Sequence, residues 1–372
     1  MTDLEVAVVG GGVIGAASAW ALAGRGVRVG LFEQFSAGHA WGASHGRARI
    51  FRLAYPDPLY VRFAQAAHPL WRDLEAETGT AVLTLTGAVD HGDPAVLAAL
   101  SAALTEAGEE TDLLPGLAAE QHWPGLRFDG PVLHHPTAGR LDADAAVAAF
   151  VDAAAARGAQ VEYGTTVDRI DLDGDGRVEV RTGSGRITAR QVVVAAGGWT
   201  AGLVTGLPGL RLPPFRLTQE QPALFVPLDP ATSWPSFIHH PGGDAPGLHP
   251  VGGVYGTGGS EGVKVGFHGV GRVVAPADRA RDAAATDPAA LAAVRTYARE
   301  WLPGVDVDTA RAQTCTYNST PDGDFVIDRV GPVTVAAGFS GHGFKFAPAV
   351  GELVADLVRG VGSSPQRWRA AG

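Results

Sequence analysis

The sequence predicts an α/β fold, in which a Rossmann-type nucleotide-binding domain carries an inserted α+β domain with an antiparallel sheet. The first observation is a βαβ pattern at the start of the chain, where strand Glu5–Val9 is followed by glycines and by strand Val27–Phe32. The second is a similar strand and helix near the end, at Val333–Ala337 and Ala347–Val358. The third is a pair of polar blocks, rich in glycine and proline, with alternating strand patterns.

The other elements follow from apolar periodicity and from the turn residues that bound it. Helices are predicted at Ala16–Gly24, Ala143–Gly158 and Pro288–Glu300. Strands are predicted at Gln160–Tyr163 and Ile187–Ala196, and an antiparallel hairpin at Thr166–Val180 that turns at residues 173–176.

The elements typical of a nucleotide-binding domain are separated along the chain by the two polar blocks. This arrangement predicts two domains, each built from segments that are not contiguous in sequence. We expect residues 1–82, 138–212 and 312–372 to form the nucleotide-binding domain. Residues 83–137 and 213–311 are expected to form the substrate domain.

Composition and charge restrict the partners of this 372-residue chain. A net charge of −10 argues against nucleic acid and anionic membranes, which both select basic surfaces. No apolar run could span a bilayer, and the chain starts without the pattern of a secretion signal. One cysteine makes no internal disulfide. His239 and His240 are adjacent and face opposite sides of a strand, so no metal site is expected. We therefore expect a cytoplasmic protein with a small-molecule partner.

The glycine-rich turn has the spacing of a dinucleotide-binding loop. Gly10 permits the tight turn, Gly12 lets the backbone approach a pyrophosphate, and Gly15 lets the helix pack close to the strand. The helix N-terminus offers amides and a positive dipole end to the phosphates. Glu33 ends the second strand, where its carboxylate would bind ribose hydroxyls and repel a 2′-phosphate.

A run of one histidine and three arginines between Ser44 and Arg52 bears on the choice between NAD and FAD. Its neighbours Trp41 and Phe51 make it too apolar for a solvated basic patch. A flavin ring needs such surroundings, because it combines an apolar body with an anionic reduced form. The sequence thus favours a glutathione-reductase-like FAD-binding domain.

Only two of the 29 basic residues are lysines, Lys264 and Lys345, and the rest are arginines. An ammonium is compact and has a tunable pKa, whereas a guanidinium is planar and permanently charged. The two lysines are therefore candidates for tasks that arginine cannot perform, with random drift as the alternative.

Several motifs together resemble the monomeric sarcosine oxidase family, which includes N-methyltryptophan oxidase and belongs to the D-amino-acid-oxidase-like flavoproteins. They are the glycine-rich turn, Ser44-His45-Gly46-x-x-Arg49-x-x-Arg52, Cys315-x-Tyr317 and Gly338-Phe339-Ser340-Gly341-His342-Gly343-Phe344-Lys345-Phe346. The resemblance covers nearly the whole chain. It implies a monomer that binds FAD covalently, as an 8α-S-cysteinyl link at Cys315.

The resemblance also implies roles for individual residues. Lys264 is implied to lie over the flavin and promote its reaction with oxygen, while Arg52 and Lys345 clamp the substrate carboxylate. Further catalytic residues are implied at His268, Tyr317, Tyr255, His45 and Arg49. Cofactor-binding residues are implied at Gly10, Gly12, Val13, Ile14, Gly15, Glu33, Ser44, His45, Arg49, Val167, Ala196, Gly197, Cys315, Gly341, Gly343, Phe344 and Lys345.

The implied reaction oxidises the C–N bond of a secondary amino acid, N-methylated or cyclic, to an imine, and reduces oxygen to hydrogen peroxide. Ala48 replaces a small polar residue of the family, and the family's pocket methionine is missing because Met1 is the only methionine. Both departures favour a substrate that is bulkier than sarcosine or cyclic. The alternatives are a flavin amine dehydrogenase that passes electrons to another carrier, and a non-catalytic FAD-binding redox protein.

Overall fold

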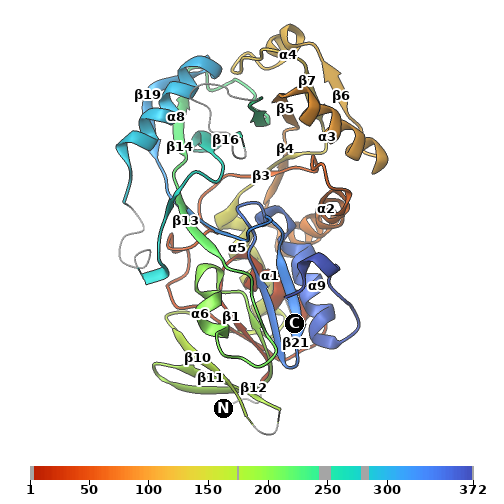
Figure 1. Cartoon of the computed structure of the whole chain (residues 1–372), viewed down its shortest axis with the longest axis vertical. Coiled ribbons are helices and arrows are strands. Elements are labelled where there is room, and N and C mark those ends of the chain that lie inside the picture. The colour runs from red at the N-terminus through yellow and green to blue at the C-terminus, as the bar shows by residue number, and fades with distance from the viewer. Residues whose placement is uncertain (1–3, 174–175, 243–252, 278–284, 371–372) are drawn as a thin grey trace.

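The computed structural model describes residues 4–173, 176–242, 253–277 and 285–370, which form two lobes that are each built around one large sheet (Figure 1). The lower lobe in the figure holds strand β1 and helix α9, which come from opposite ends of the chain. The upper lobe holds elements from the middle of the chain.

The sheet of the lower lobe is mostly parallel and has an apolar core on each face. Its strands run in the order β10-β11-β12-β1-β2-β9, and β22 pairs with both β12 and β21. The pairs β9–β2, β2–β1, β1–β12 and β12–β22 are parallel. The strands are β1 (Leu4–Val9), β2 (Val29–Phe32), β9 (Gln160–Glu162), β10 (Val167–Leu172), β11 (Val178–Thr182), β12 (Gly185–Val194), β21 (Val326–Val330) and β22 (Val333–Ala337).

Three helices pack together in the lower lobe: α1 (Val13–Gly24), α5 (Ala143–Ala156) and α9 (Ala347–Arg359). Small residues let their backbones approach closely. A Cβ atom at Gly351 of α9 would lie 2.5 Å from the carbonyl oxygen of Ala17 on α1, so only glycine fits there. This packing fixes the start of α1, which faces the candidate site.

The sheet of the upper lobe runs in the order β19-β14-β17-β16-β15-β5-β7-β6, and all its pairs are antiparallel except β15–β5. Helix α8 (Pro288–Trp301) packs against β17 and β19. The strands are β5 (Ala88–Gly92), β6 (Asp112–Leu114), β7 (Val132–His135), β14 (Ala223–Pro227), β15 (Ser236–His240), β16 (Val254–Gly259), β17 (Gly262–Phe267) and β19 (Val305–Ala312).

Two small sheets supply residues to the candidate site. One has the order β3-β8-β4 and the other β18-β13-β20. Their strands are β3 (Arg49–Phe51), β4 (Leu83–Leu85), β8 (Gly139–Leu141), β13 (Arg216–Glu220), β18 (Arg272–Val273) and β20 (Cys315–Ser319). The remaining helices are α2 (Pro58–Thr78), α3 (Pro94–Glu106), α4 (Gly116–His122) and α6 (Thr200–Val204), with 3-10 turns η1 (Gly197–Trp199), η2 (Phe344–Phe346) and η3 (Gln366–Trp368).

The predicted α/β fold is confirmed, with small shifts at the ends of elements. Helix α1 begins at Val13 rather than Ala16, because Gly12 already serves as its N-cap residue. Helix α5 ends at Ala156, two residues early, since Gly158 adopts a φ of 93° that ends the helical path. Residues 174 and 175 of the predicted hairpin turn lie outside the described residues.

The predicted division into domains stays a prediction. Strands of the upper sheet come from residues 88–135 and 223–312. However, β13 from the expected substrate domain pairs with β20 from the expected nucleotide-binding domain. The two regions are thus joined by a ladder of backbone hydrogen bonds, which holds Cys315 opposite Glu220.

Candidate active site

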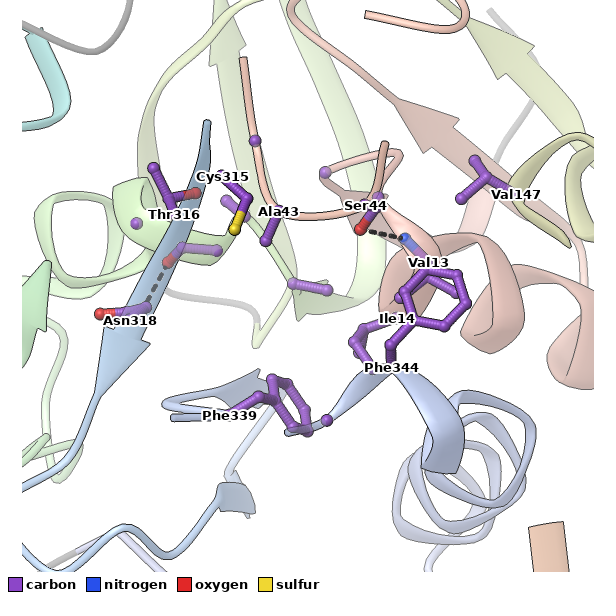
Figure 2. Close-up of a pocket in the computed structure, with 18 of the residues that line it drawn as sticks. Val13, Ile14, Ala43, Ser44, Val147, Cys315, Thr316, Asn318, Phe339 and Phe344 are labelled. Atoms are coloured by element: carbon purple, nitrogen blue, oxygen red, sulfur yellow. Dashed lines mark hydrogen bonds between the residues drawn. The ribbon is translucent and has the colours of Figure 1, made fainter. Parts of the chain in front are cut away.

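A cavity of about 850 Å³ is lined by residues from both lobes. Figure 2 shows part of it: Cys315 and Asn318 on β20 lie on one side, and Val13, Ile14 and Ser44 lie on the other. The sulfur of Cys315 points into the space between them. Most of the predicted site residues line this cavity, and Gly15 and His45 do not.

The glycine-rich turn forms one end of the cavity. Gly10 has a φ of 104°, and a Cβ atom there would lie 2.6 Å from the carbonyl oxygen of Ala195. Gly15 lies behind the lining, where a Cβ atom would overlap the carbonyl oxygen of Gly10. The hydroxyl of Ser44 accepts a hydrogen bond from the Val13 amide at 3.1 Å (Figure 2). These glycines therefore keep the start of α1 open for a ligand.

The carboxylate of Glu33 lies beside this turn, at the end of β2. It accepts hydrogen bonds from the amides of Gly11 at 2.6 Å and Phe35 at 2.9 Å. The ring of Phe35 lies against the rings of His39 and Trp199, with centroids 4.8 Å and 5.8 Å away. These three rings were not predicted from the sequence; they line the cavity and offer flat surfaces for stacking.

The guanidinium of Arg49 is held by three backbone carbonyl oxygens, those of Ala48 at 2.9 Å, Ala43 at 3.0 Å and His45 at 2.6 Å. His45 thus contributes its backbone to the position of Arg49, while its ring does not line the cavity. Because carbonyl oxygens orient the guanidinium without cancelling its charge, Arg49 keeps a positive charge at the cavity wall.

Lys264 extends from β17 into the cavity and is only 7% exposed. Its Nζ lies 3.5 Å from the carbonyl oxygen of Ala48. Burial is the main cause that lowers the pKa of Lys264 to about 7, and the charge of Arg49 adds to it. No carboxylate among the described residues forms an ion pair with Lys264.

Three aromatic side chains surround another part of the cavity. The ring of His268 lies 5.1 Å from that of Tyr317 and 6.4 Å from that of Tyr255. Burial, followed by the charge of Arg52, lowers the pKa of His268 to about 4. Burial also raises the pKa values of both tyrosines. All three are therefore neutral near pH 7 and line this region without adding charge.

Arg52 and Lys345 meet at the ring of Tyr55, a residue that was not predicted to belong to the site. The Nζ atom of Lys345 donates to the Tyr55 hydroxyl at 2.8 Å, and the Arg52 guanidinium carbon lies 4.7 Å from the ring centroid. Arg52 also donates to the carbonyl oxygen of Ala54 at 2.8 Å. Tyr55 thus holds the side chains of Arg52 and Lys345 next to each other at the cavity wall, and their role as a carboxylate clamp stays a prediction.

A buried carboxylate, Asp90 on β5, lies behind this pair and was also missed. Its Oδ1 atom lies 3.5 Å from Arg52 and 2.7 Å from Nε2 of His240, and its Oδ2 atom lies 3.5 Å from Nε2 of His135. Burial alone would raise the pKa of Asp90, but these histidines and Arg52 outweigh it and hold that pKa well below its usual range. The surrounding sequence, Ala88-Val89-Asp90-His91-Gly92, has two polar residues in succession and no pattern that would have singled out Asp90.

Further predicted residues also line the cavity, and their role as cofactor contacts stays a prediction: Ile14, Val167, Ala196, Gly197, Gly341, Gly343 and Phe344. The described residues hold no group of acidic, histidine or cysteine side chains that could bind a metal ion, and none of the described helices is long and apolar enough to cross a bilayer. The glycine turn and the basic side chains that line the same cavity fit a dinucleotide that carries an electron-accepting ring.

Fold and cavity together define a dinucleotide-binding oxidoreductase with one deep site for cofactor and substrate. The chain belongs to the FAD dependent oxidoreductase family, whose model matches residues 5–357. It is similar to the monomeric sarcosine oxidase of Bacillus sp. (strain NS-129), at 33% identity over 370 residues that cover 96% of this chain and 93% of that protein. It is also similar to the N-methyl-L-tryptophan oxidase of Salmonella arizonae, at 28% identity over 95% of this chain and 94% of that one.

Solved structures support the same assignment. NikD, an amino acid oxidase of nikkomycin biosynthesis, is similar with a TM-score of 0.85 and 27% identity, over 100% of this chain and 98% of that one. The L-proline dehydrogenase from P. horikoshii is similar with a TM-score of 0.82 and 26% identity, over 96% of this chain and 93% of that one. The predicted FAD-dependent enzyme class and the predicted family are thereby confirmed.

Proposed function

We propose that this protein oxidises the C–N bond of a secondary amino acid to an imine and reduces oxygen to hydrogen peroxide. One observation carries the proposal. Lys264 and Lys345 are both buried at the cavity wall, and neither forms an ion pair with a carboxylate of the described residues. Buried cations are costly unless an anion joins them. Two such lysines, each positively charged when an anion joins it, suit two anions: the substrate carboxylate and the product of oxygen reduction.

The first anion, the substrate carboxylate, is assigned to Arg52 and Lys345. A guanidinium binds a carboxylate with two parallel hydrogen bonds, and an ammonium adds a compact charge. Tyr55 keeps the two groups together. Once the carboxylate is fixed, the neutral rings of His268, Tyr255 and Tyr317 limit the space in which the amine carbon can lie.

The second anion is the one that oxygen becomes when it accepts an electron, and Lys264 is assigned to it. A fixed positive charge in a site shielded from water stabilises such an anion far more than it would in bulk solvent. Arg49 lies close enough to lower the pKa of Lys264, so an anion between the two would restore its charge.

FAD, when bound, supplies the two-electron chemistry. Its phosphates are assigned to the amides at the start of α1, and its ribose to Glu33. We further propose a covalent link at Cys315, whose sulfur faces the cavity next to Thr316 (Figure 2). The cysteine is buried and forms no disulfide, so a thiol is available there. His45 is proposed to act only through the position of Arg49.

The proposed substrate is an N-methylated or cyclic amino acid that is bulkier than sarcosine. Similar proteins are named for sarcosine and for N-methyl-L-tryptophan, which share a secondary amine next to a carboxylate. Ala48 and the lack of any pocket methionine leave room for a larger side chain. We also propose a cytoplasmic monomer, in agreement with the single cysteine and the acidic charge.

A second candidate is an amine dehydrogenase that passes its electrons to another carrier. The similarity to L-proline dehydrogenase favours it. Lys264 argues against it, because a dehydrogenase has no use for a cation that accelerates the reaction with oxygen.

The test is a panel of secondary amino acids offered to the purified flavoprotein, with peroxide and the flavin spectrum followed together. Under anaerobic conditions, a true substrate should bleach the flavin, and added oxygen should restore the colour with one peroxide per turnover. Bleaching followed by very slow recovery in air would favour the dehydrogenase. A flavin that no amine in the panel bleaches would contradict both.

A further inference from the structure

The balance of charge around Lys345 is unusual. Its Nζ atom donates to the Tyr55 hydroxyl at 2.8 Å and to the carbonyl oxygen of His342 at 2.7 Å, and both acceptors are neutral. Lys345 is 5% exposed, and no described carboxylate lies within 4.0 Å of Nζ. A buried ammonium without a counterion is expensive, so these surroundings favour the neutral amine.

The nearest buried anion, Asp90, is already used by other groups. It lies 3.5 Å from Arg52 and is hydrogen-bonded to His240 at 2.7 Å, while His135 lies 3.5 Å away. Arg52 therefore has its own counterion before any substrate arrives. The arginine and the aspartate cancel, which leaves no negative charge to hold a proton on Lys345.

The other groups that face Lys345 act in the same direction. Arg52 is a permanent cation, and burial together with its charge holds the pKa of Lys345 well below its usual range. Burial also keeps the pKa values of His268 and His342 below their usual range, so both are neutral. Burial raises the pKa of Tyr55 to about 12, so its hydroxyl keeps its proton.

We infer that Lys345, neutral in the substrate-free enzyme, accepts the proton that the substrate ammonium group must lose before its amine can be oxidised. This inference rests on the proposed function. The N–H bond of the ammonium breaks and leaves its electron pair on the substrate nitrogen, and the proton forms a new N–H bond with the lone pair of Lys345. The free amine that results can be oxidised, and the new Lys345 cation lies beside the substrate carboxylate.

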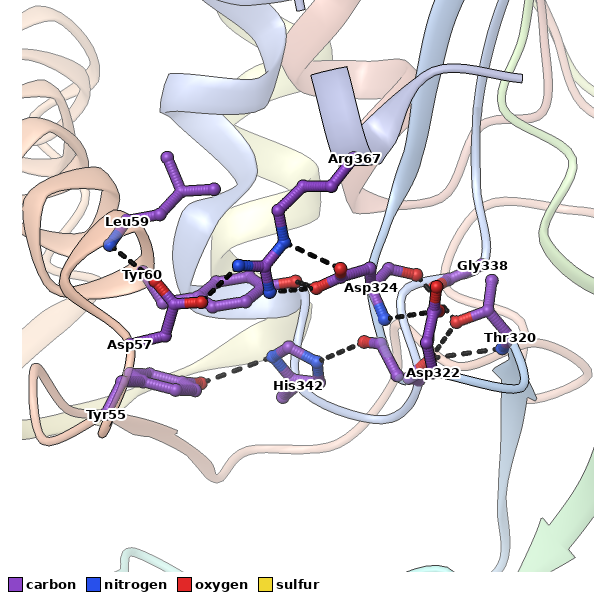
Figure 3. A network of polar contacts seen from close by, with 12 residues as sticks. Tyr55, Asp57, Leu59, Tyr60, Thr320, Asp322, Asp324, Gly338, His342 and Arg367 are labelled. Atoms are coloured by element: carbon purple, nitrogen blue, oxygen red, sulfur yellow. Dashed lines mark hydrogen bonds and ion pairs between the residues drawn. The ribbon is translucent and has the colours of Figure 1, made fainter. Parts of the chain in front are cut away.

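The cycle balances with this single proton. Loss of a hydride, which is two electrons and one proton, converts the neutral amine into an iminium ion. Oxygen takes up the equivalent of that hydride and one further proton to become hydrogen peroxide. Lys345 holds that proton in the meantime. The Tyr55 hydroxyl, which accepts from Nζ of Lys345, lies 3.4 Å from Nδ1 of His342 (Figure 3). Nε2 of His342 lies 3.1 Å from the carbonyl oxygen of Gly323. This hydrogen-bonded chain fixes the lysine and continues away from the cavity.

The experiment measures proton uptake when propionate binds to the holoenzyme, by calorimetry in buffers of different ionisation enthalpy. Propionate brings a carboxylate but no ammonium, so Lys345 must take its proton from solvent. The expected result is uptake of about one proton per site near neutral pH. Lys345→Arg keeps a cation but cannot accept a proton, so its uptake should fall to about zero while binding persists.

His240→Gln is the matched control, because it removes the titratable group next to Asp90 and leaves Lys345 intact. It should retain the uptake. An uptake that disappears in His240→Gln but persists in Lys345→Arg would overturn the inference, as would wild-type enzyme that takes up no proton.

A second measurement does not depend on any variant. An amino acid that brings its own ammonium should bind to wild-type enzyme under anaerobic conditions with no net exchange of protons, whereas release of a proton would contradict the inference. Failure of the proposed function looks different, because no amino acid would then bleach the flavin. If an amino acid bleaches the flavin, but proton uptake on propionate binding is the same in wild type and in Lys345→Arg, only this inference is wrong and the proposed function stands.

Discussion

The two ends of the cavity are built from different parts of the chain. The nucleotide end is made of backbone: amides at the start of α1 and glycines that leave space for a ligand. The substrate end is made of side chains, with Arg52, Lys264 and Lys345 coming from segments that are far apart in sequence. The first end depends on local geometry and tolerates no added atom. The second depends on charge, and its residues can be exchanged singly to separate one step of the reaction from another.

The largest effect is expected from an added methyl group at the nucleotide end. In Gly15→Ala, the new Cβ atom would overlap the carbonyl oxygen of Gly10, so α1 must move away from the turn. The variant should lose all or nearly all bound flavin and unfold at a lower temperature. Absorbance of the purified protein and thermal unfolding provide the measurement. Gly183→Ala, where a Cβ atom meets open space, is the control, and equal flavin content in both would contradict the idea.

The next effect is all-or-none and concerns the proposed link at Cys315. Acid-precipitated wild-type protein should remain yellow, because a thioether survives denaturation whereas non-covalent FAD is released. Cys315→Ser should release its colour into the supernatant. Thr316→Ser, on the same strand and also at the cavity, should behave like wild type. A colourless wild-type pellet would show that the flavin is not covalently bound.

At the substrate end, Lys264→Met should slow reoxidation of the reduced flavin by about a hundredfold to a thousandfold. Reduction by substrate should change much less, and stopped-flow measurement separates the two half-reactions. Lys345→Met is the matched comparison and should show the reverse pattern. Equal losses in both half-reactions for Lys264→Met would mean that this lysine is structural.

The same lysine predicts a pH dependence. The protonated form is the one that stabilises an anion, and burial lowers the pKa of Lys264 to about 7. The reaction with oxygen should therefore slow as the pH rises through that value, or through a higher one when an anion is bound. The dependence should be absent in Lys264→Met.

Arg52→Lys tests whether the guanidinium of Arg52 binds the substrate carboxylate with two hydrogen bonds, and a smaller effect is expected. A lysine keeps the charge but cannot contact both the carbonyl oxygen of Ala54 and a carboxylate in one plane. Propionate should bind at least about tenfold more weakly, which is a cost of ~1.4 kcal/mol or more. Perturbation of the flavin spectrum provides the dissociation constant. A secondary amine without a carboxylate is the control ligand. An equal loss of affinity for both ligands would mean that Arg52 does not bind the carboxylate.

The smallest effect on activity is expected outside the cavity. Arg367 pairs with Asp57 at the start of α2 and with Asp324, which also accepts from Tyr60 (Figure 3). Arg367→Ala should lower the free energy of unfolding by about 1 kcal/mol, because the pair is partly exposed, and should leave both half-reactions nearly unchanged.

The pH dependence of that loss has a definite sign. Burial would raise the pKa of Asp324, but Arg367 and Tyr60 lower it overall. The contribution of Asp324 to the free energy of unfolding is therefore fully present above the carboxyl's unfolded pKa of about 4. It is lost as the pH falls through the lower pKa of the folded state. The difference between wild type and variant should shrink in acid, and a difference that grows instead would contradict the pairing.

Much of this protein could be predicted from the sequence because the nucleotide end is local. Gly10, Gly12 and Gly15 are close together in the sequence, and their spacing indicates a dinucleotide-binding loop without reference to distant residues. The scarcity of lysine singled out Lys264 and Lys345, and both line the cavity. Helix α2 was missed although it is 21 residues long, because Pro69 interrupts the helical pattern, and tertiary packing against α9 outweighs that local cost.

What only the tertiary structure decided is the charge state of the substrate end. Neither Asp90 on β5 nor Tyr55 after β3 could be assigned a role in the site from the sequence, because their partners are distant along the chain and no short-range pattern links them. Folding brings Asp90 to Arg52 and Tyr55 to Lys345, and so decides which cation has a counterion and which does not. Sequence specifies which charges the chain carries, but burial and distance set what each charge costs, and these exist only once the chain is folded.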